Sequence, residues 1–201
     1  MPLPLGLILD VGHVGKPAPD HRDRGATADG RVESDLAMRY VLAAEVYAVK
    51  LGLAVHVVQP GPSGMRYSER HREAVQVAQR DRSRRWLYLQ CHLNSAERDP
   101  RYGLVGYDPR SAAGKRAAEL LSASLAVELA GTIDRARAEA AEGDWSRMMS
   151  TIAGIYVGPG TLSGVCFEPC FIQSRTLEQA DTVAKIGRAL VDGAVRGAAE
   201  S

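Results

Sequence analysis

The sequence predicts a single α/β domain in which a twisted, mostly parallel sheet carries helices on both faces. Short apolar runs alternate with longer segments whose apolar residues keep a helical spacing, and this alternation is typical of a parallel sheet. A chain of 201 residues is long enough for one domain with a proper core and short for two. We see no internal repeat, low-complexity tract or linker, so we assign residues 1–201 to one domain.

The first half of the chain alternates strands and helices. Residues 5–11 predict a strand, because they are apolar enough to be buried on both faces of a sheet. Residues 12–30 are rich in Gly, Pro, Asp and Arg and predict a long loop with little structure of its own, and loops of that length are usually functional. Residues 32–51 keep helical apolar spacing. We then expect a strand over 53–58, a turn at 60–64 and a helix over 68–82.

The second half continues the same alternation. Residues 86–91 predict a third strand, and residues 103–107 predict a short fourth strand near an edge of the sheet. The charged, alanine-rich stretch 131–150 predicts a short amphipathic helix or a flap. The other expected elements are a helix over 111–129, strands at 155–157 and 164–168, and a closing helix over 176–196.

The composition is that of an ordinary soluble globular protein, with 45% hydrophobic residues, 24% charged residues and a net charge of +1. Dedicated nucleic-acid binders concentrate basic residues on one face, so this balance disfavours that class. The amino terminus lacks the basic region of a signal peptide, and no stretch approaches the ~18 apolar residues of a transmembrane helix. We expect a monomer that is made in the cytoplasm, binds no nucleic acid and does not insert into membranes.

The three cysteines, Cys91, Cys166 and Cys170, give no disulfide framework. On one extended segment, Cys166 and Cys170 would lie roughly 13 Å apart, which is too far for a disulfide without a bend. We therefore expect all three to be small buried residues beside strand ends.

Polar residues that can bind a metal follow several of the predicted elements. His13 and His92 come just after two apolar strands, Glu168 ends a third, and Glu33 begins the first helix. In an open α/β sheet, ligands bind beyond the carboxyl ends of the strands. Two imidazoles and a carboxylate form a catalytic zinc set with an open position, and a spare carboxylate can act as general base. These residues alone do not decide which glutamate is the ligand and which is the base.

Simpler structural explanations also exist. A strand-end histidine is more often hydrogen-bonded within the fold than bound to a metal, and Glu33 suits the start of a helix. Glu168 is harder to explain in this way, because its apolar surroundings make an unpartnered carboxylate costly to bury. Among the other histidines, we expect His21 to be solvated, although it could approach the metal, His56 to be structural within a strand, and His71 to be exposed on a helix.

Four blocks of the sequence resemble, in the same order, motifs of the zinc-dependent N-acetylmuramoyl-L-alanine amidases of the amidase-3 type. Leu9-Asp-Val-Gly-His-Val-Gly resembles the opening "hDPGHGG" block, and Glu33 falls where that family places a glutamate at the start of its first long helix. Leu89-Gln-Cys-His-Leu-Asn-Ser-Ala resembles the "hSIHANSA" block, and Val165-Cys-Phe-Glu-Pro-Cys-Phe resembles "hVELGFhSN". Ser68-Glu-Arg is also similar to a helix-start motif of the family.

The resemblance implies roles for these residues. It implies that His13, Glu33 and His92 bind Zn²⁺ and that Glu168 is the catalytic acid/base. It implies that the substrate is peptidoglycan, cleaved at the amide between the lactyl group of N-acetylmuramic acid and L-alanine. Two further residues of the blocks, Asn94 and Ser95, would then contact the substrate.

The sequence departs from the family pattern at several positions. Val11 replaces a proline, Val14 replaces a glycine, Cys91 precedes the second histidine, and Pro169-Cys170 follows the glutamate. None of these changes removes a ligand, but they leave the shape of the substrate groove open. The resemblance includes no cell-wall-binding module and no export signal. That pattern suits a compact phage endolysin, which acts on the cell wall after its release from the cytoplasm.

Two other functions stay open at this point. One keeps the metal and changes the substrate, as in a zinc carboxypeptidase or deacylase acting on small amides. The other is a cell-wall-binding or regulatory module with a decayed active site, and the intact set of candidate ligands argues against it.

Overall fold

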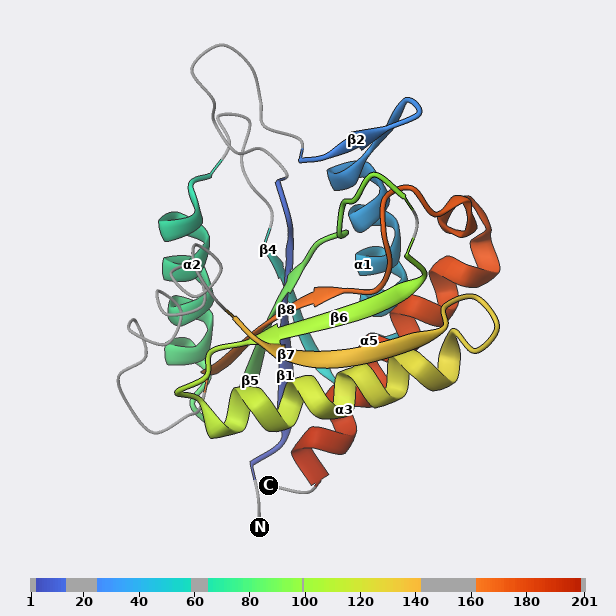
Figure 1. Cartoon of the computed structure of the whole chain (residues 1–201). Coiled ribbons are helices and arrows are strands. Elements are labelled where there is room, and N and C mark those ends of the chain that lie inside the picture. Colours follow the sequence, from blue (N-terminus) through green and yellow to red (C-terminus); the bar gives the residue numbers. More distant parts are fainter. Residues whose placement is uncertain (1–2, 14–24, 59–64, 99, 142–161, 200–201) are drawn as a thin grey trace.

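The computed structural model describes residues 3–13, 25–58, 65–98, 100–141 and 162–199, which form a six-stranded sheet with helices on both faces (Figure 1). The strand order is β4-β1-β5-β8-β6-β7. Strands β4, β1, β5 and β8 run parallel, β6 is antiparallel to β8, and β7 is parallel to β6. In sheet order the strands are Ala54–Val58, Leu5–Val11, Arg85–Cys91, Leu162–Glu168, Tyr102–Tyr107 and Arg135–Ala140.

Four α-helices cover the sheet within the described part of the chain. Helices α1, α3 and α5 pack side by side on one face, and α5 lies between the other two (Figure 1). Helix α2 covers the opposite face, against β4 and β5. The bounds, in chain order, are α1 Glu33–Lys50, α2 Tyr67–Arg80, α3 Ala112–Glu128 and α5 Ala180–Ala199. The predicted fold class is therefore confirmed.

Alternation along the strands divides the core into two clusters. On β1, Leu7 and Leu9 join the larger cluster beneath α1, α3 and α5, whereas Ile8 joins the smaller one beneath α2. Such two-sided burial explains why the central strands are almost continuously apolar. All three cysteines are buried, as predicted, and none of them forms a disulfide.

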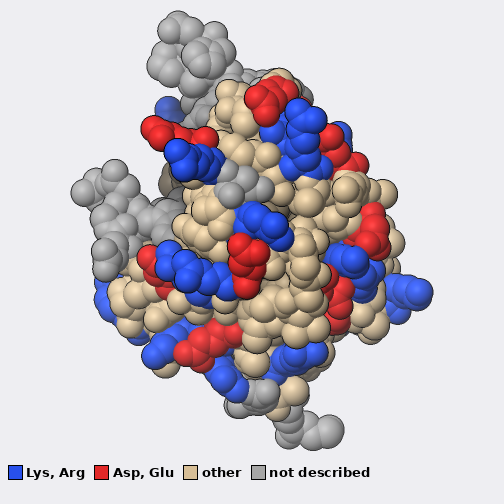
Figure 2. All heavy atoms as spheres, turned by 45° about the vertical axis from the view of Figure 1, so that its right-hand side comes forward, with Lys and Arg blue, Asp and Glu red and all other residues tan. Residues whose placement is uncertain are grey.

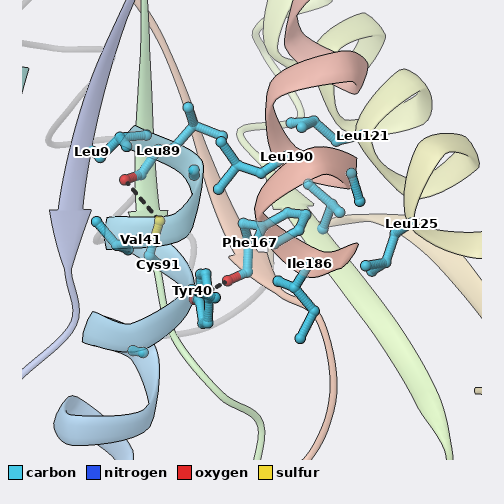
Figure 3. Packing of buried hydrophobic residues seen from close by; sticks show 14 of the residues in the cluster. Leu9, Tyr40, Val41, Leu89, Cys91, Leu121, Leu125, Phe167, Ile186 and Leu190 are labelled. Carbon is cyan, nitrogen blue, oxygen red and sulfur yellow. Dashed lines mark hydrogen bonds between the residues drawn. The ribbon is translucent and has the colours of Figure 1, made fainter. Parts of the chain in front are cut away.

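The larger cluster also fixes the ends of two central strands. Figure 3 shows Tyr40 of α1 beside Cys91 and Phe167, near the ends of β5 and β8. The Tyr40 hydroxyl donates a hydrogen bond to the His92 carbonyl, at 2.9 Å, and lies 3.4 Å from the Phe167 carbonyl. Helix α1 is thus tied to the carboxyl edge of the sheet.

Most predicted elements are confirmed to within a few residues, but one prediction is wrong. Residues 135–140, which we expected in a helix or flap, form the edge strand β7. Their sequence alternates alanine with arginine or glutamate, and the alanines face the core while the charged side chains face outward. Strand β6 lies near the edge, as predicted, with β7 outside it. The rest of the predicted flap, the turn at 60–64 and the strand at 155–157 lie outside the described residues.

The end of the predicted first loop is more structured than we expected. Strands β2, Thr27–Ala28, and β3, Arg31–Val32, form a short antiparallel hairpin. Its turn residues Asp29 and Gly30 both have positive φ angles, 50° and 75°, as a two-residue hairpin turn requires. Another short element, the 3-10 turn η1 at Arg175–Glu178, precedes α5.

The surface shows no strong segregation of charge on the face drawn in Figure 2, where basic and acidic side chains are interspersed. No helix among the described residues is both long and apolar enough to cross a bilayer.

Candidate metal centre

The parallel strands deliver the predicted site residues to one edge of the sheet. His13 lies two residues beyond β1, His92 directly follows β5, and Glu168 is the last residue of β8. Val11 pairs with Cys91, and Cys91 pairs with Phe167, so His13, His92 and Glu168 all come within two residues of this common level. Glu33 enters the same place from the first turn of α1.

The Glu33 carboxylate is the centre of this group. Its Oε1 lies 3.0 Å from Nδ1 of His92 and 3.6 Å from Nε2 of His13. Two backbone amides orient the carboxylate, since the amide of Leu93 donates to Oε1 at 3.2 Å and the amide of Ala26 donates to Oε2 at 2.8 Å. One ligand atom from each of His13, Glu33 and His92 lies within 4.8 Å of the others.

These distances fit a single metal ion. Ligand atoms bound to one tetrahedral zinc lie about 3.4 Å apart, and this value falls between the two carboxylate–imidazole distances of 3.0 Å and 3.6 Å. The imidazole rings of His13 and His92 meet edge to face, with centroids 5.0 Å apart. Apart from Glu33, no described residue offers a hydrogen-bond partner to either ring nitrogen of His92. The donor set therefore fits a metal held by two histidines and one glutamate.

Two glycines, Gly12 and Gly25, make room for the side chains of His13, Glu33 and His92 because they lack a Cβ. A Cβ added to Gly12 would lie 2.5 Å from Nδ1 of His92. A Cβ added to Gly25 would lie 2.5 Å from Oε2 of Glu33 and 2.7 Å from the His13 ring. The backbone therefore approaches all three candidate ligands too closely for any larger residue.

The two glutamates of the site differ in their pKa values. Burial acts to raise the pKa of Glu33, but the hydrogen bond and positive charge of His92, with the charge of His13, outweigh it and hold that pKa below its usual value. Burial raises the pKa of Glu168 to about 7, and the negative charge of Glu33 adds to this, against the opposing effects of His92 and the Cys166 thiol. Despite burial, the neighbouring groups therefore favour the ionised form of Glu33, whereas burial gives Glu168 a pKa at which a carboxyl group can exchange a proton near neutral pH.

Asn94 and Ser95 lie beside the centre without a described role in it. The Asn94 side chain accepts a hydrogen bond from the backbone amide of Ser95 at 2.8 Å. The Asn94 backbone pairs with Cys170 and Ile172, which joins this segment to the chain after β8. Asn94 is half-buried and Ser95 is exposed, so their contact with substrate stays a prediction.

Sequence reasoning missed a buried polar cluster on the α2 face. Asp10 pairs with Arg70, and Tyr88 donates a hydrogen bond to the same carboxylate. His71, which we expected to be exposed, is only 2% exposed, and its Nε2 lies 2.9 Å from Nε2 of Gln90. One signal was available, because a carboxylate within the apolar strand 5–11 requires a buried partner.

Neither of the other two histidines, His56 and His21, is placed at the metal centre by the structure. His56 on β4 contacts Glu73 of α2 at 2.6 Å, consistent with a structural role. His21 lies outside the described residues.

The chain is similar over nearly its whole length to solved structures of N-acetylmuramoyl-L-alanine amidases. Ami1 from Mycobacterium smegmatis matches with a TM-score of 0.70 and 16% identity, covering 98% of each chain. AmiC2 of Nostoc punctiforme matches with a TM-score of 0.68 and 17% identity, covering 96% of each chain. The catalytic domain of the CD27L endolysin, which targets Clostridia difficile, matches with a TM-score of 0.61 and 13% identity, covering 96% of this chain and 97% of that one.

No protein-family model and no curated protein matches the chain by sequence. At these identities, the structural similarity establishes that the chain has the fold of these amidases.

Proposed function

We propose that this chain is a zinc-dependent amidase that hydrolyses the bond between N-acetylmuramic acid and L-alanine in peptidoglycan. The observation that carries the proposal is the convergence of His13, Glu33 and His92 on one ligand position, at the sheet edge of a fold shared with N-acetylmuramoyl-L-alanine amidases. The fold and the donor set support the same conclusion independently, since one rests on the backbone and the other on three side chains.

The donor set favours zinc. Neutral imidazoles and a carboxylate are ligands that Zn²⁺ accepts in catalytic sites, where three protein ligands leave one position open. His13, Glu33 and His92 would hold the ion. When bound, zinc acts as a Lewis acid that polarises the amide carbonyl and lowers the pKa of water.

Glu168 supplies the proton transfers in this proposal. Its carboxylate accepts a proton as a water oxygen forms a bond to the lactyl carbonyl carbon. It then returns the proton to the alanine nitrogen as the carbon–nitrogen bond breaks. A pKa near 7 suits both steps, because the same group must take up and release a proton at neutral pH.

Product analysis tests this function. Purified protein with zinc should release stem peptides with a free L-alanine amino terminus from purified sacculi, as detected by mass spectrometry. We expect E168Q to bind zinc and to lose about 10²- to 10⁴-fold in rate, the usual range for a general acid/base. H56A, which removes a histidine outside the metal centre, is the control and should keep the wild-type rate.

The outcome also separates the alternatives. Turnover of free acyl-amino acids without cleavage of sacculi would retain the metal chemistry and replace the substrate with small amides. Binding to sacculi without any turnover, with zinc present, would indicate a wall-binding module. Full activity in E168Q would contradict the mechanism.

We also propose that the enzyme reaches the wall from the cytoplasm after release, as an endolysin does. The similarity to the catalytic domain of an endolysin supports this role. Cells that produce the protein should lyse only once their membrane is permeabilised, and cells that produce E168Q should not lyse. Lysis by the wild-type protein without permeabilisation would contradict this route.

A further inference from the structure

Asp10 connects the first strand to the α2 face just before the metal centre begins. It lies three residues before His13, and its carboxylate is buried. One carboxylate oxygen accepts a hydrogen bond from Nη1 of Arg70, and the other accepts one from the Tyr88 hydroxyl. Arg70 and Tyr88 are buried as well, so all three side chains are fixed within the fold.

Arg70 makes a second contact that reaches the backbone. The same Nη1 donates to the carbonyl oxygen of Val11, the last residue of β1, at 2.7 Å. The amide of Gly12, the other end of this peptide group, donates to the Cys91 carbonyl of β5 at 2.8 Å. Because a peptide group is planar, holding its carbonyl and its amide fixes the orientation of the chain that follows.

The chain that follows is the turn that presents His13. This residue has a φ of +62°, a left-handed conformation that residues other than glycine rarely adopt. Such a conformation persists when the surrounding structure holds it in place. The Val11–Gly12 peptide, held at both ends by hydrogen bonds, therefore sets the direction of the turn that places the His13 ring beside Glu33.

Stability alone does not account for a buried ion pair at this place. Two apolar side chains of similar size are often as stabilising as a buried pair, because the charges must first lose their water. Many pairs of apolar residues would dock α2 onto β1 equally well. A guanidinium is different, since it can hold a carboxylate and a backbone carbonyl at the same time.

We propose that Arg70 and Asp10 are positioning residues that hold the Val11–Gly12 peptide and thereby place His13 for metal binding. This inference rests on the metal centre of the proposed function. It assigns the pair no contact with the metal and no part in the chemistry. Tyr88 assists by fixing the second oxygen of the Asp10 carboxylate.

The deciding variant replaces both charges by apolar residues of similar size. D10L/R70M leaves no unpaired buried charge, so the metal-free protein should remain folded. Its melting temperature should fall moderately, because the Val11 carbonyl and the Tyr88 hydroxyl each lose a hydrogen-bond partner. Its zinc dissociation constant should nevertheless rise about 10- to 100-fold, the usual cost of losing a group that orients a ligand. Titration of metal-free protein with zinc, monitored by competition with a chelating dye, measures this directly.

A second double variant controls for the loss of an ion pair as such. E128L/R188M removes the Glu128–Arg188 pair, which joins α3 to α5 on the other face of the sheet, and should bind zinc as the wild type does. If D10L/R70M does not fold, Y88F decides the question, because it keeps both charges and removes one hydrogen bond to Asp10. Weaker zinc binding in Y88F supports the inference, and unchanged binding overturns it.

The readout separates this inference from the proposed function. Equal zinc affinity in the wild type and in folded D10L/R70M overturns the positioning role and leaves the amidase function untouched. A wild-type protein that binds zinc without cleaving sacculi contradicts the amidase function and leaves the positioning role testable. A wild-type protein that does not bind zinc contradicts both.

Discussion

Two residues of the same type acquire different properties at this site because of their surroundings. Glu33 sits among two imidazoles and two backbone amides, and these groups favour its charged form. Glu168 is buried at the end of β8, where loss of water and the negative charge of Glu33 favour its neutral form. Opposite pKa shifts of neighbouring carboxyl groups are a common way for one site to hold both a ligand and a proton carrier.

The raised pKa of Glu168 predicts how the metal-free protein responds to pH. The folded-state pKa of about 7 lies above the usual 4.5, so the folded state favours the protonated form. This stabilising contribution is fully present below about pH 4.5 and is lost as pH rises through about 7. The loss at alkaline pH should reach about 3 kcal/mol in the free energy of unfolding.

Urea unfolding in the presence of a chelator, at about pH 5 and about pH 8.5, measures this loss. E168Q is the control, because it should remove this component of the pH dependence and leave the rest. Identical pH dependence in the wild type and E168Q would show that burial does not perturb this carboxyl.

The close approach of the backbone to the ligands predicts a different effect for two similar glycines. Gly25 and Gly30 both have positive φ, +80° and +75°, so alanine strains either position by about 1 kcal/mol. Only the Cβ at Gly25 would meet Glu33 and His13, since nothing lies within 4 Å of a Cβ at Gly30. G25A should therefore lose zinc affinity and G30A should keep it. Equal affinities in the two variants would contradict the described geometry.

At the scale of single elements, α1 links the core to the metal centre. Tyr40 donates to the carbonyl of His92 from a fully buried position, so Y40F leaves a buried carbonyl without this donor and should cost about 1–2 kcal/mol in the free energy of unfolding. Y47F is the matched control on the same helix. Its hydroxyl contacts the Asp192 carboxylate at 3.2 Å in a partly buried place, so we expect a smaller loss. Chemical denaturation of both variants gives the comparison.

The elements that the sequence predicts well are those with strong apolar patterns. Strands 5–11 and 86–91 are buried on both faces, and their apolar runs leave little choice of structure. Residues 135–140 misled the prediction because their charged and alanine-rich composition suggests a helix. Their strict alternation of alanine and charged residues is a strand pattern, and the structure follows this alternation rather than the composition.

The site was predictable only in part, for a physical reason. His13, His92 and Glu168 follow apolar strands, and parallel pairing brings such strand ends together. The sequence did not show which glutamate is the ligand and which is the base. The position of Glu33 depends on where α1 begins and on hydrogen bonds from the amides of Ala26 and Leu93, and no local sequence pattern reveals these. The Arg70 contact likewise joins segments 59 and 60 residues apart, so its partner could not be read from spacing.

At the scale of the whole molecule, the fold explains how a metal centre can be assembled from distant segments. Parallel order of β1, β5 and β8 places three chain segments at one edge, and α1 adds a fourth. The similarity to amidases at 13–17% identity shows that this fold tolerates wide sequence change. The proposed function requires that two imidazoles and one carboxylate converge at this edge of the sheet.

Metal stoichiometry after equilibrium dialysis against zinc tests that convergence most directly. We predict one tightly bound zinc per chain in the wild type and in H56A, and loss of that zinc in H13A and H92A. Each variant should first be shown to be folded by circular dichroism. A wild-type protein without zinc, or H13A and H92A proteins that retain it, would contradict the account.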